Sequence, residues 1–140
     1  MLKNVHPLLT SDLLSVLTSM GHGNEIAIVD ANFPAAACAQ QLIAMPGINV
    51  TEIMDAILTV FPLDDFVEQP VSYMRAPREE LPIYKEFAAS VVKGEGRKIE
   101  LAGIAPSDFY TRAQNAFAVI ASGERRLYGN VLLRKGVIRP

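Results

Sequence analysis

Residues 25–29 read EIAIV, and they decide the fold of this chain. The run is short, β-branched and largely apolar on both faces, a pattern that predicts a strand in the middle of a sheet. Directly after it, residues 30–34 read DANFP. Open α/β sheets place their ligand sites just beyond the ends of buried strands. These ten residues therefore predict both the centre of the fold and the position of a site.

Helical and extended patterns alternate outward from this strand. On its N-terminal side, Thr10 or Ser11 can cap a helix whose apolar stripe runs from Leu13 to Met20, and Gly21 can end it with a positive φ. The elements expected on the C-terminal side are a loop over 35–40, strands over 41–45, 70–74, 98–101 and 131–134, helices over about 50–61, 82–92 and 106–122, and a turn at 94–96. This alternation predicts an α/β protein with three layers, α/β/α, around a mixed β-sheet, in a single domain over residues 1–140.

The composition excludes several classes of protein. Thirteen basic residues face fifteen acidic ones, and no cluster of Lys and Arg offers the basic face that nucleic acid requires. The single cysteine, Cys38, rules out an internal disulfide and a multi-thiolate metal site. The apolar runs are far shorter than the roughly 20 residues of a membrane helix, so we expect a cytoplasmic protein. A mean hydropathy of +0.22 is high for so short a chain and predicts a homo-oligomer that covers apolar surface.

Two side chains that can carry chemistry flank the predicted central strand. His22 lies between Gly21 and Gly23, so its imidazole is uncrowded by neighbouring side chains and can give and take a proton near neutral pH. An equally good interpretation is a loop histidine that fills space or caps the C-terminus of the preceding helix. Asp30 either faces a ligand or hydrogen-bonds its own backbone in a turn, the commoner use of aspartate. Because four or five strand residues span roughly 15 Å, we expect the two side chains at opposite ends of the strand. A loop excursion or a second subunit would then have to bring them together.

A third candidate segment, Tyr128-Gly129-Asn130, precedes the last predicted strand. A phenol with an apolar face and an amide with both donors and an acceptor suit a polyhydroxylated ligand such as a sugar. The alternative is a hairpin-type turn in which Gly129 and Asn130 adopt positive φ. The sequence contains no Walker, zinc or serine-hydrolase motif, and we expect neither a metal nor a cofactor.

Five segments in a fixed order resemble those of one protein family. They are MLK at 1–3, GHGNEI at 21–26, DANFP at 30–34, FYTRA at 109–113 and GERRLYGN at 123–130. From end to end the chain is similar to the RbsD/FucU family of sugar mutarotases. The GHG-x-E and DANFP segments resemble the fucose mutarotase branch more than the ribose branch.

The resemblance implies an RbsD/FucU-like fold and an isomerase that interconverts anomers of L-fucose or a related aldose without a cofactor. Acid/base catalysis would open and reclose the cyclic hemiacetal. By the same resemblance, His22 is the proton donor, and Asp30, Tyr128, Gly129 and Asn130 bind the monosaccharide. The family further implies a decameric ring, with sites where subunits meet.

One position departs from the family pattern. The fucose mutarotases have an arginine three residues before the Phe-Tyr of the last helix, and Pro106 stands there in this chain. Proline offers no charged donor, so the preferred sugar stays open, with Arg112 or Ser107 as candidates to replace the arginine. Two alternative functions also stay open: a ribose-type pyranase, and a non-catalytic monosaccharide-binding protein, which needs no titrating group at position 22.

Overall fold

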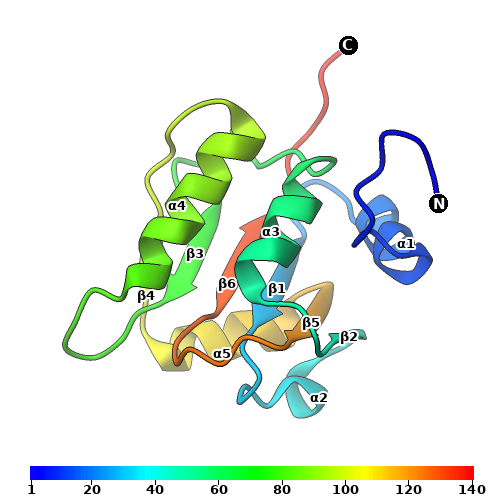
Figure 1. The fold of residues 1–140 in the computed structure, drawn as a ribbon. Coiled ribbons are helices and arrows are strands. Elements are labelled where there is room, and N and C mark those ends of the chain that lie inside the picture. The colour runs from blue at the N-terminus through cyan, green and yellow to red at the C-terminus, as the bar shows by residue number, and fades with distance from the viewer.

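A six-stranded sheet is the centre of the fold in the computed structural model, which describes residues 1–140 (Figure 1). Strand β1 (Glu25–Val29) lies inside it, parallel to β5 (Ala118–Ser122) and antiparallel to β6 (Val131–Arg134). Residues 26–29 are fully buried, because helices cover both faces of the sheet. The prediction of a buried central strand is confirmed.

The remaining strands extend the sheet to both sides. Strand β2 (Leu42–Met45) pairs with β5 at one edge, whereas β3 (Val71–Met74) pairs with β6 and carries β4 (Ala102–Ile104) at the other. Only β6 runs against the other five strands. The sheet is therefore mixed, and the carboxyl ends of five strands meet the start of β6 at one end of the sheet.

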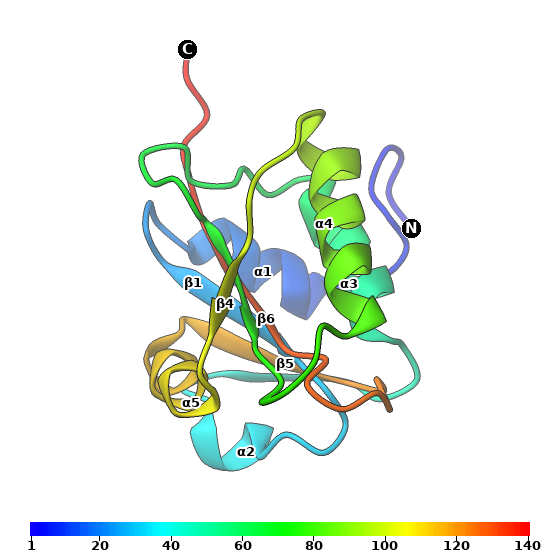
Figure 2. The same ribbon diagram turned by 90° about the vertical axis from the view of Figure 1, so that its left-hand side faces the viewer.

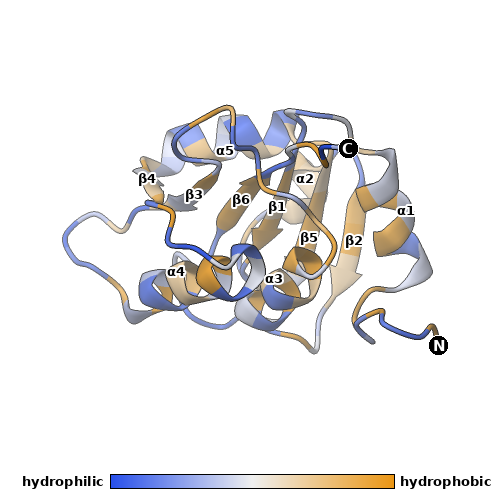
Figure 3. Cartoon of the chain, turned by 90° about the horizontal axis from the view of Figure 1, so that it is seen from above, coloured by the Kyte–Doolittle hydropathy of each residue, from blue (hydrophilic) through white to orange (hydrophobic).

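Helices form a layer on each face, as Figures 2 and 3 show. The larger core lies under α1 (Ser11–Ser19), α3 (Val50–Leu58) and α4 (Pro82–Glu95). The smaller one lies under α2 (Ala35–Cys38) and α5 (Pro106–Asn115). Side chains of each strand alternate between the two: Ile26 and Ile28 enter the larger core, and Ala27 and Val29 the smaller. This is the expected three-layer α/β/α class.

Local signals account for where the helices begin. Thr10 accepts a hydrogen bond from the Leu13 N–H, and Asn49 accepts one from the Glu52 N–H, so both act as N-caps. Pro82 and Pro106 occupy the first turns of α4 and α5, where a missing N–H costs nothing. None of the helices is both long and apolar enough to cross a membrane.

One predicted helix was too long, and a strand was missed. The last helix was expected to continue through Ile120 to Gly123, but α5 ends at Asn115 and residues 118–122 form β5. The segment AVIAS is buried on both faces of the sheet, between β1 and β2. A short apolar run of this kind fits a buried helix and a buried strand equally, so its periodicity could not separate them.

Smaller differences fall at element ends. The expected loop over 35–40 contains α2, and the strand expected over 98–101 lies instead at Ala102–Ile104. Gly94 and Glu95 belong to the last turn of α4, which ends at Gly96 with φ +74°, so only Gly96 acts as the turn residue. After α1 the positive φ falls on Gly23 (+84°) and not on Gly21.

Candidate functional site

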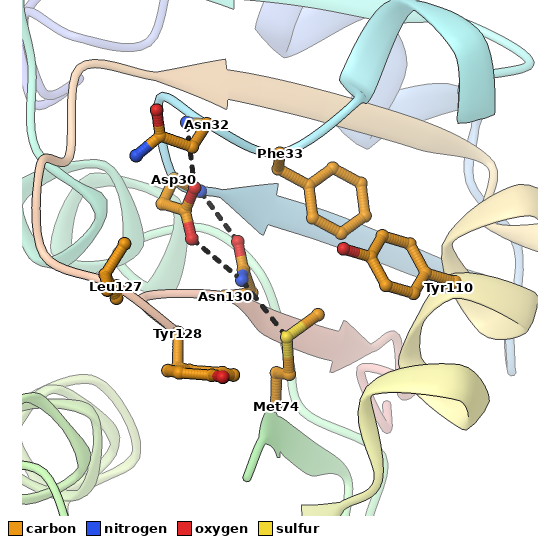
Figure 4. Close-up of a pocket in the computed structure, with 8 residues that line it drawn as sticks. All are labelled: Asp30, Asn32, Phe33, Met74, Tyr110, Leu127, Tyr128 and Asn130. Atoms are coloured by element: carbon orange, nitrogen blue, oxygen red, sulfur yellow. Dashed lines mark hydrogen bonds between the residues drawn. The ribbon is translucent and has the colours of Figure 1, made fainter. Parts of the chain in front are cut away.

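A pocket of about 220 Å³ opens where the carboxyl end of β1 meets the start of β6 (Figure 4). This is the end of the sheet where open α/β folds bind ligands. Its lining comes from the segments after β1, at the end of β3, within α5 and before β6: Asp30, Asn32, Phe33, Met74, Tyr110, Leu127, Tyr128 and Asn130. The structure thus brings Asp30 together with Tyr128 and Asn130, which lie 98 and 100 positions further along the chain, whereas the predicted Gly129 does not line the pocket.

Asp30 and Asn130 hold each other in a closed pair. The Asp30 N–H donates to Asn130 Oδ1 (2.7 Å), and Asn130 Nδ2 donates to Asp30 Oδ2 (2.9 Å). Asp30 Oδ1 also accepts the Asn32 N–H (2.9 Å). The pair forms because β1 and β6 are adjacent and antiparallel. Each carboxylate oxygen has two acceptor sites, so this buried carboxylate can still accept a ligand hydroxyl.

Aromatic rings form the apolar wall of the pocket. Phe33 stacks on Tyr110, with ring centroids 5.1 Å apart and planes 20° apart. Tyr128 lies on the other side of the Asp30–Asn130 pair in Figure 4, with Met74 between the two walls. A few polar groups set among apolar and aromatic surface are typical of small-molecule sites. The sequence suggested Tyr128 but not the Phe33–Tyr110 stack, whose members are 77 positions apart.

The turn before β6 differs from the simple hairpin alternative. Positive φ falls on Tyr128 (+59°), not on Gly129 or Asn130. Gly129 is required for a different reason: a Cβ there would lie 2.9 Å from Glu124 Cγ and 3.1 Å from the Arg126 carbonyl oxygen. A bulky residue rarely adopts positive φ, and such strain is typical of functional sites.

His22 lies at the opposite end of β1, in the connection from α1. Its Nε2 is 3.0 Å from Asp64 Oδ1, and its ring packs 4.9 Å from that of Phe66. The imidazole is 43% exposed. Its expected separation from Asp30 holds: the five residues of β1 span roughly 16 Å. One chain therefore forms two clusters and does not bring His22 to the pocket.

Asp64 is the residue of the His22 cluster that the sequence did not reveal. Its side chain is fully buried, and Arg134 Nε donates to its Oδ2 (2.8 Å). Burial raises the pKa of Asp64, but hydrogen bonds from Arg134, the Phe66 N–H and His22 outweigh it and hold the pKa below its usual value. The carboxylate is therefore ionised beside His22. The one sequence signal was an acidic pair between two apolar residues, LDDF at 63–66.

Arg112 and Ser107, the two residues that could replace the family arginine at position 106, do not line the pocket. The Arg112 guanidinium bonds Glu25 and Ser72 Oγ (3.0 Å), on strand residues away from Asp30. Ser107 lies exposed in the first turn of α5. Asp30 is thus the only charged residue that lines the pocket in one chain. No three His, Cys, Asp or Glu side chains lie close enough together to hold a metal ion.

This chain is similar to known proteins over nearly its whole length. Residues 3–138 match the RbsD / FucU transport protein family. A fucose mutarotase from Homo sapiens is 40% identical over 146 residues, which covers 98% of this chain and 94% of the human protein. The L-fucose mutarotase of Glaesserella parasuis is 38% identical, with 98% and 96% covered. The structure of a Streptococcus pneumoniae fucose mutarotase in complex with L-fucose matches with a TM-score of 0.91 and 37% identity, covering 99% and 100%.

Proposed function

This chain belongs to the RbsD/FucU family, and from that premise we propose that it is a cofactor-free mutarotase acting on L-fucose or a closely related aldose. The resemblance expected from the sequence, including the closer likeness to the fucose branch, is confirmed by these relatives. The observation that carries the proposal is the pocket itself. It joins the Asp30–Asn130 pair to a stacked aromatic wall, which suits the hydroxyls and the apolar face of one monosaccharide.

The reaction needs only a few catalytic groups. Opening a cyclic hemiacetal takes a proton from the anomeric hydroxyl and delivers one to the ring oxygen, and the free aldehyde then rotates and recloses on its other face. Because the reaction already proceeds in water, one positioned acid/base, worth about 10²–10⁴-fold, supplies a useful acceleration. No step requires a metal or a redox cofactor.

We assign the acid/base role to His22. With the ionised Asp64 accepting from Nε2, a neutral ring carries its proton there and leaves Nδ1 as an acceptor. Asp64 orients the ring and stabilises the imidazolium that forms when Nδ1 takes a proton, the part that a buried carboxylate plays beside other catalytic histidines. Asp64 is thus a positioning residue, and Asp30, Tyr128, Gly129 and Asn130 form the sugar-binding set.

Assembly would bring the two clusters together. Because His22 and the pocket lie at opposite ends of β1, we propose that His22 of one subunit completes the pocket of its neighbour in a closed homo-oligomer, for which the family implies a decameric ring. Exposed apolar side chains support this: Phe66, which packs on the His22 ring, is 65% exposed. The C-terminal segment reaches the Phe66 ring through Arg139, whose guanidinium lies 5.3 Å from the ring centroid, and Ile138 in that segment is 81% exposed. Such patches mark interaction sites. We place the domain, residues 1–140, in the cytoplasm, where its free Cys38 stays reduced.

Saturation-transfer NMR tests the proposal, because it measures anomer exchange at equilibrium. We expect the protein to accelerate exchange between the anomers of L-fucose more than that of D-ribose, at protein concentrations where His22→Ala does not. Binding of L-fucose without faster exchange would overturn the proposal in favour of a binding protein. Faster exchange of D-ribose alone would instead assign the ribose activity.

A further inference from the structure

The connection between β5 and β6 contains a buried ion pair that the proposed reaction does not use. Glu124 is 4% exposed. Its Oε1 accepts hydrogen bonds from the Arg126 backbone N–H (3.0 Å) and from Arg126 Nε (2.9 Å), and its Oε2 accepts one from Nη2 (2.9 Å). A carboxylate is costly to bury unless it is paired and hydrogen-bonded. Both carboxylate oxygens of Glu124 accept hydrogen bonds from Arg126, which lies two positions further along the chain.

The backbone of Glu124 is tied to both neighbours of Asp30. Its N–H donates to Ser122 Oγ (3.1 Å), whose hydroxyl donates to the Val29 carbonyl (2.6 Å). Its carbonyl accepts the Ala31 N–H (2.8 Å). The backbone of Glu124 is therefore fixed next to Asp30, independently of the contacts that its side chain makes.

The side chain of Glu124 lies under the turn that faces the pocket. Gly129 passes so close that a Cβ would lie 2.9 Å from Glu124 Cγ. Next to it, Tyr128 is held at φ +59°. A strained conformation of this kind persists only where the surroundings over-determine it. Glu124 Cγ, the Arg126 carbonyl oxygen and Ile83 Cδ1 are the atoms that would surround a Cβ at Gly129.

We propose that Glu124 is a positioning residue for the sugar pocket, because its ion pair with Arg126 fixes the turn that aims Tyr128 and Asn130 at the sugar. The inference rests on the proposed function for the identity of the ligand, but the geometry that it describes exists without ligand. Hydrogen bonds from Arg126 lower the pKa of Glu124 against the effect of burial. The pair is thus charged at neutral pH.

The same guanidinium supplies a matched control. Arg126 also pairs with Glu86 on α4, where the two side chains are 43% and 41% exposed. Exposed ion pairs contribute little to stability. Glu86→Gln therefore removes a carboxylate partner of Arg126 and leaves the turn and the pocket untouched.

The experiment compares Glu124→Gln, Arg126→Ala and Glu86→Gln in the full chain. Anomer exchange of L-fucose, measured at increasing sugar concentration, gives KM and kcat separately. We expect KM to rise about tenfold in the first two variants, with a smaller change in kcat, because the binding groups are misplaced and a hydrogen bond to a charged group is worth about this factor. Glu86→Gln should match the wild type. Without sugar, the side-chain amide signals of Asn130 should shift in the first two variants only.

The double variant Glu124→Gln with Arg126→Gln keeps the test decisive if a single variant does not fold, because it removes the ion pair and leaves no unpaired charge buried. Wild-type KM and unshifted Asn130 signals in the folded variants would overturn the inference, even if their melting temperatures fall. A wild-type protein that exchanges no sugar anomers would end the proposed function instead. The Asn130 signals would still decide whether Glu124 positions the turn.

Discussion

At the scale of single residues, the groups proposed for sugar binding and for proton transfer lie in separate clusters. Asp30 and Asn130 fix each other through two hydrogen bonds of 2.7 and 2.9 Å. His22 instead has one ring nitrogen on Asp64 and the other available. The two functions can therefore be removed one at a time.

Substitutions in the His22 cluster should abolish exchange and spare sugar binding by the pocket. We expect His22→Ala to lower the exchange rate by about 10²–10⁴-fold, the usual contribution of one acid/base group. Asp64→Asn should lower it less, since the amide still contacts the ring but does not stabilise the imidazolium. Saturation-transfer NMR measures both rates, with circular dichroism as the control for folding. Undiminished exchange in His22→Ala would remove this residue from the mechanism.

Substitutions in the pocket should weaken binding. Asn130→Ala removes a hydrogen-bond partner of the buried Asp30 carboxylate and a proposed contact with the sugar, and we expect a loss of about 1–3 kcal/mol in binding free energy. Asp30→Asn should cost a similar amount, because the acceptor loses its charge. Titration of L-fucose followed by NMR gives the dissociation constants. If both variants bind as tightly as the wild type, the sugar site lies elsewhere.

Asp64 should also make stability depend on pH in the acid range. Its pKa is lower in the folded protein than its ordinary value, so the unfolded chain binds a proton first as pH falls. The stability gained from the ionised carboxylate is complete above about pH 5 and is lost through pH 4 and below. The difference in free energy of unfolding between wild type and Asp64→Asn should therefore shrink on acidification. Urea denaturation from pH 7 to pH 3 measures it; a difference that grows on acidification would contradict this sign.

At the scale of elements, β5 joins the edge strand β2 to β1, the strand that leads into the pocket. It lies between β1 and β2, and Gly123, directly after it, contacts the turn that follows β2. A Cβ on Gly123 would lie 2.2 Å from the Pro46 carbonyl oxygen. This contact is with backbone on a neighbouring segment, so it cannot be relieved by a side-chain rotation.

Gly123→Ala should accordingly destabilise the fold by about 1–3 kcal/mol or more, the usual cost of overpacking. Gly47, in the same region, has nothing within 4 Å of its Cβ position, so Gly47→Ala is the matched control and should change stability by less than about 0.5 kcal/mol. Thermal or urea unfolding measures both. Equal stability of the two variants would mean that the close approach at Gly123 is absent in solution.

At the scale of the whole molecule, β1 separates the two proposed functional clusters, and in the proposed oligomer a second copy would join them. A closed oligomer with isologous or ring contacts repeats the same junction at every interface. A shared site of this kind predicts complementation between two inactive subunits.

Co-expression of His22→Ala with Asp30→Ala should restore activity. In randomly mixed oligomers, roughly a quarter of the junctions combine an intact His22 with an intact pocket. We expect the mixture to show roughly a quarter of the wild-type exchange rate, and each variant alone to show almost none. Light scattering confirms that the mixed oligomers assemble. A mixture as inactive as its components would mean that the site is built within one chain.

The sequence by itself determined the features that depend on neighbouring residues. EIAIV identified the central strand, Thr10 or Ser11 marked the start of the first helix, and the length of β1 separated His22 from Asp30. Tertiary structure alone decided that residues 118–122 are a strand, because an apolar run buried on both faces has no periodicity of its own. It also decided the contacts His22–Asp64 and Phe33–Tyr110. These partners lie 42 and 77 positions apart, and only the order of strands in the sheet, which no local pattern encodes, brings them together.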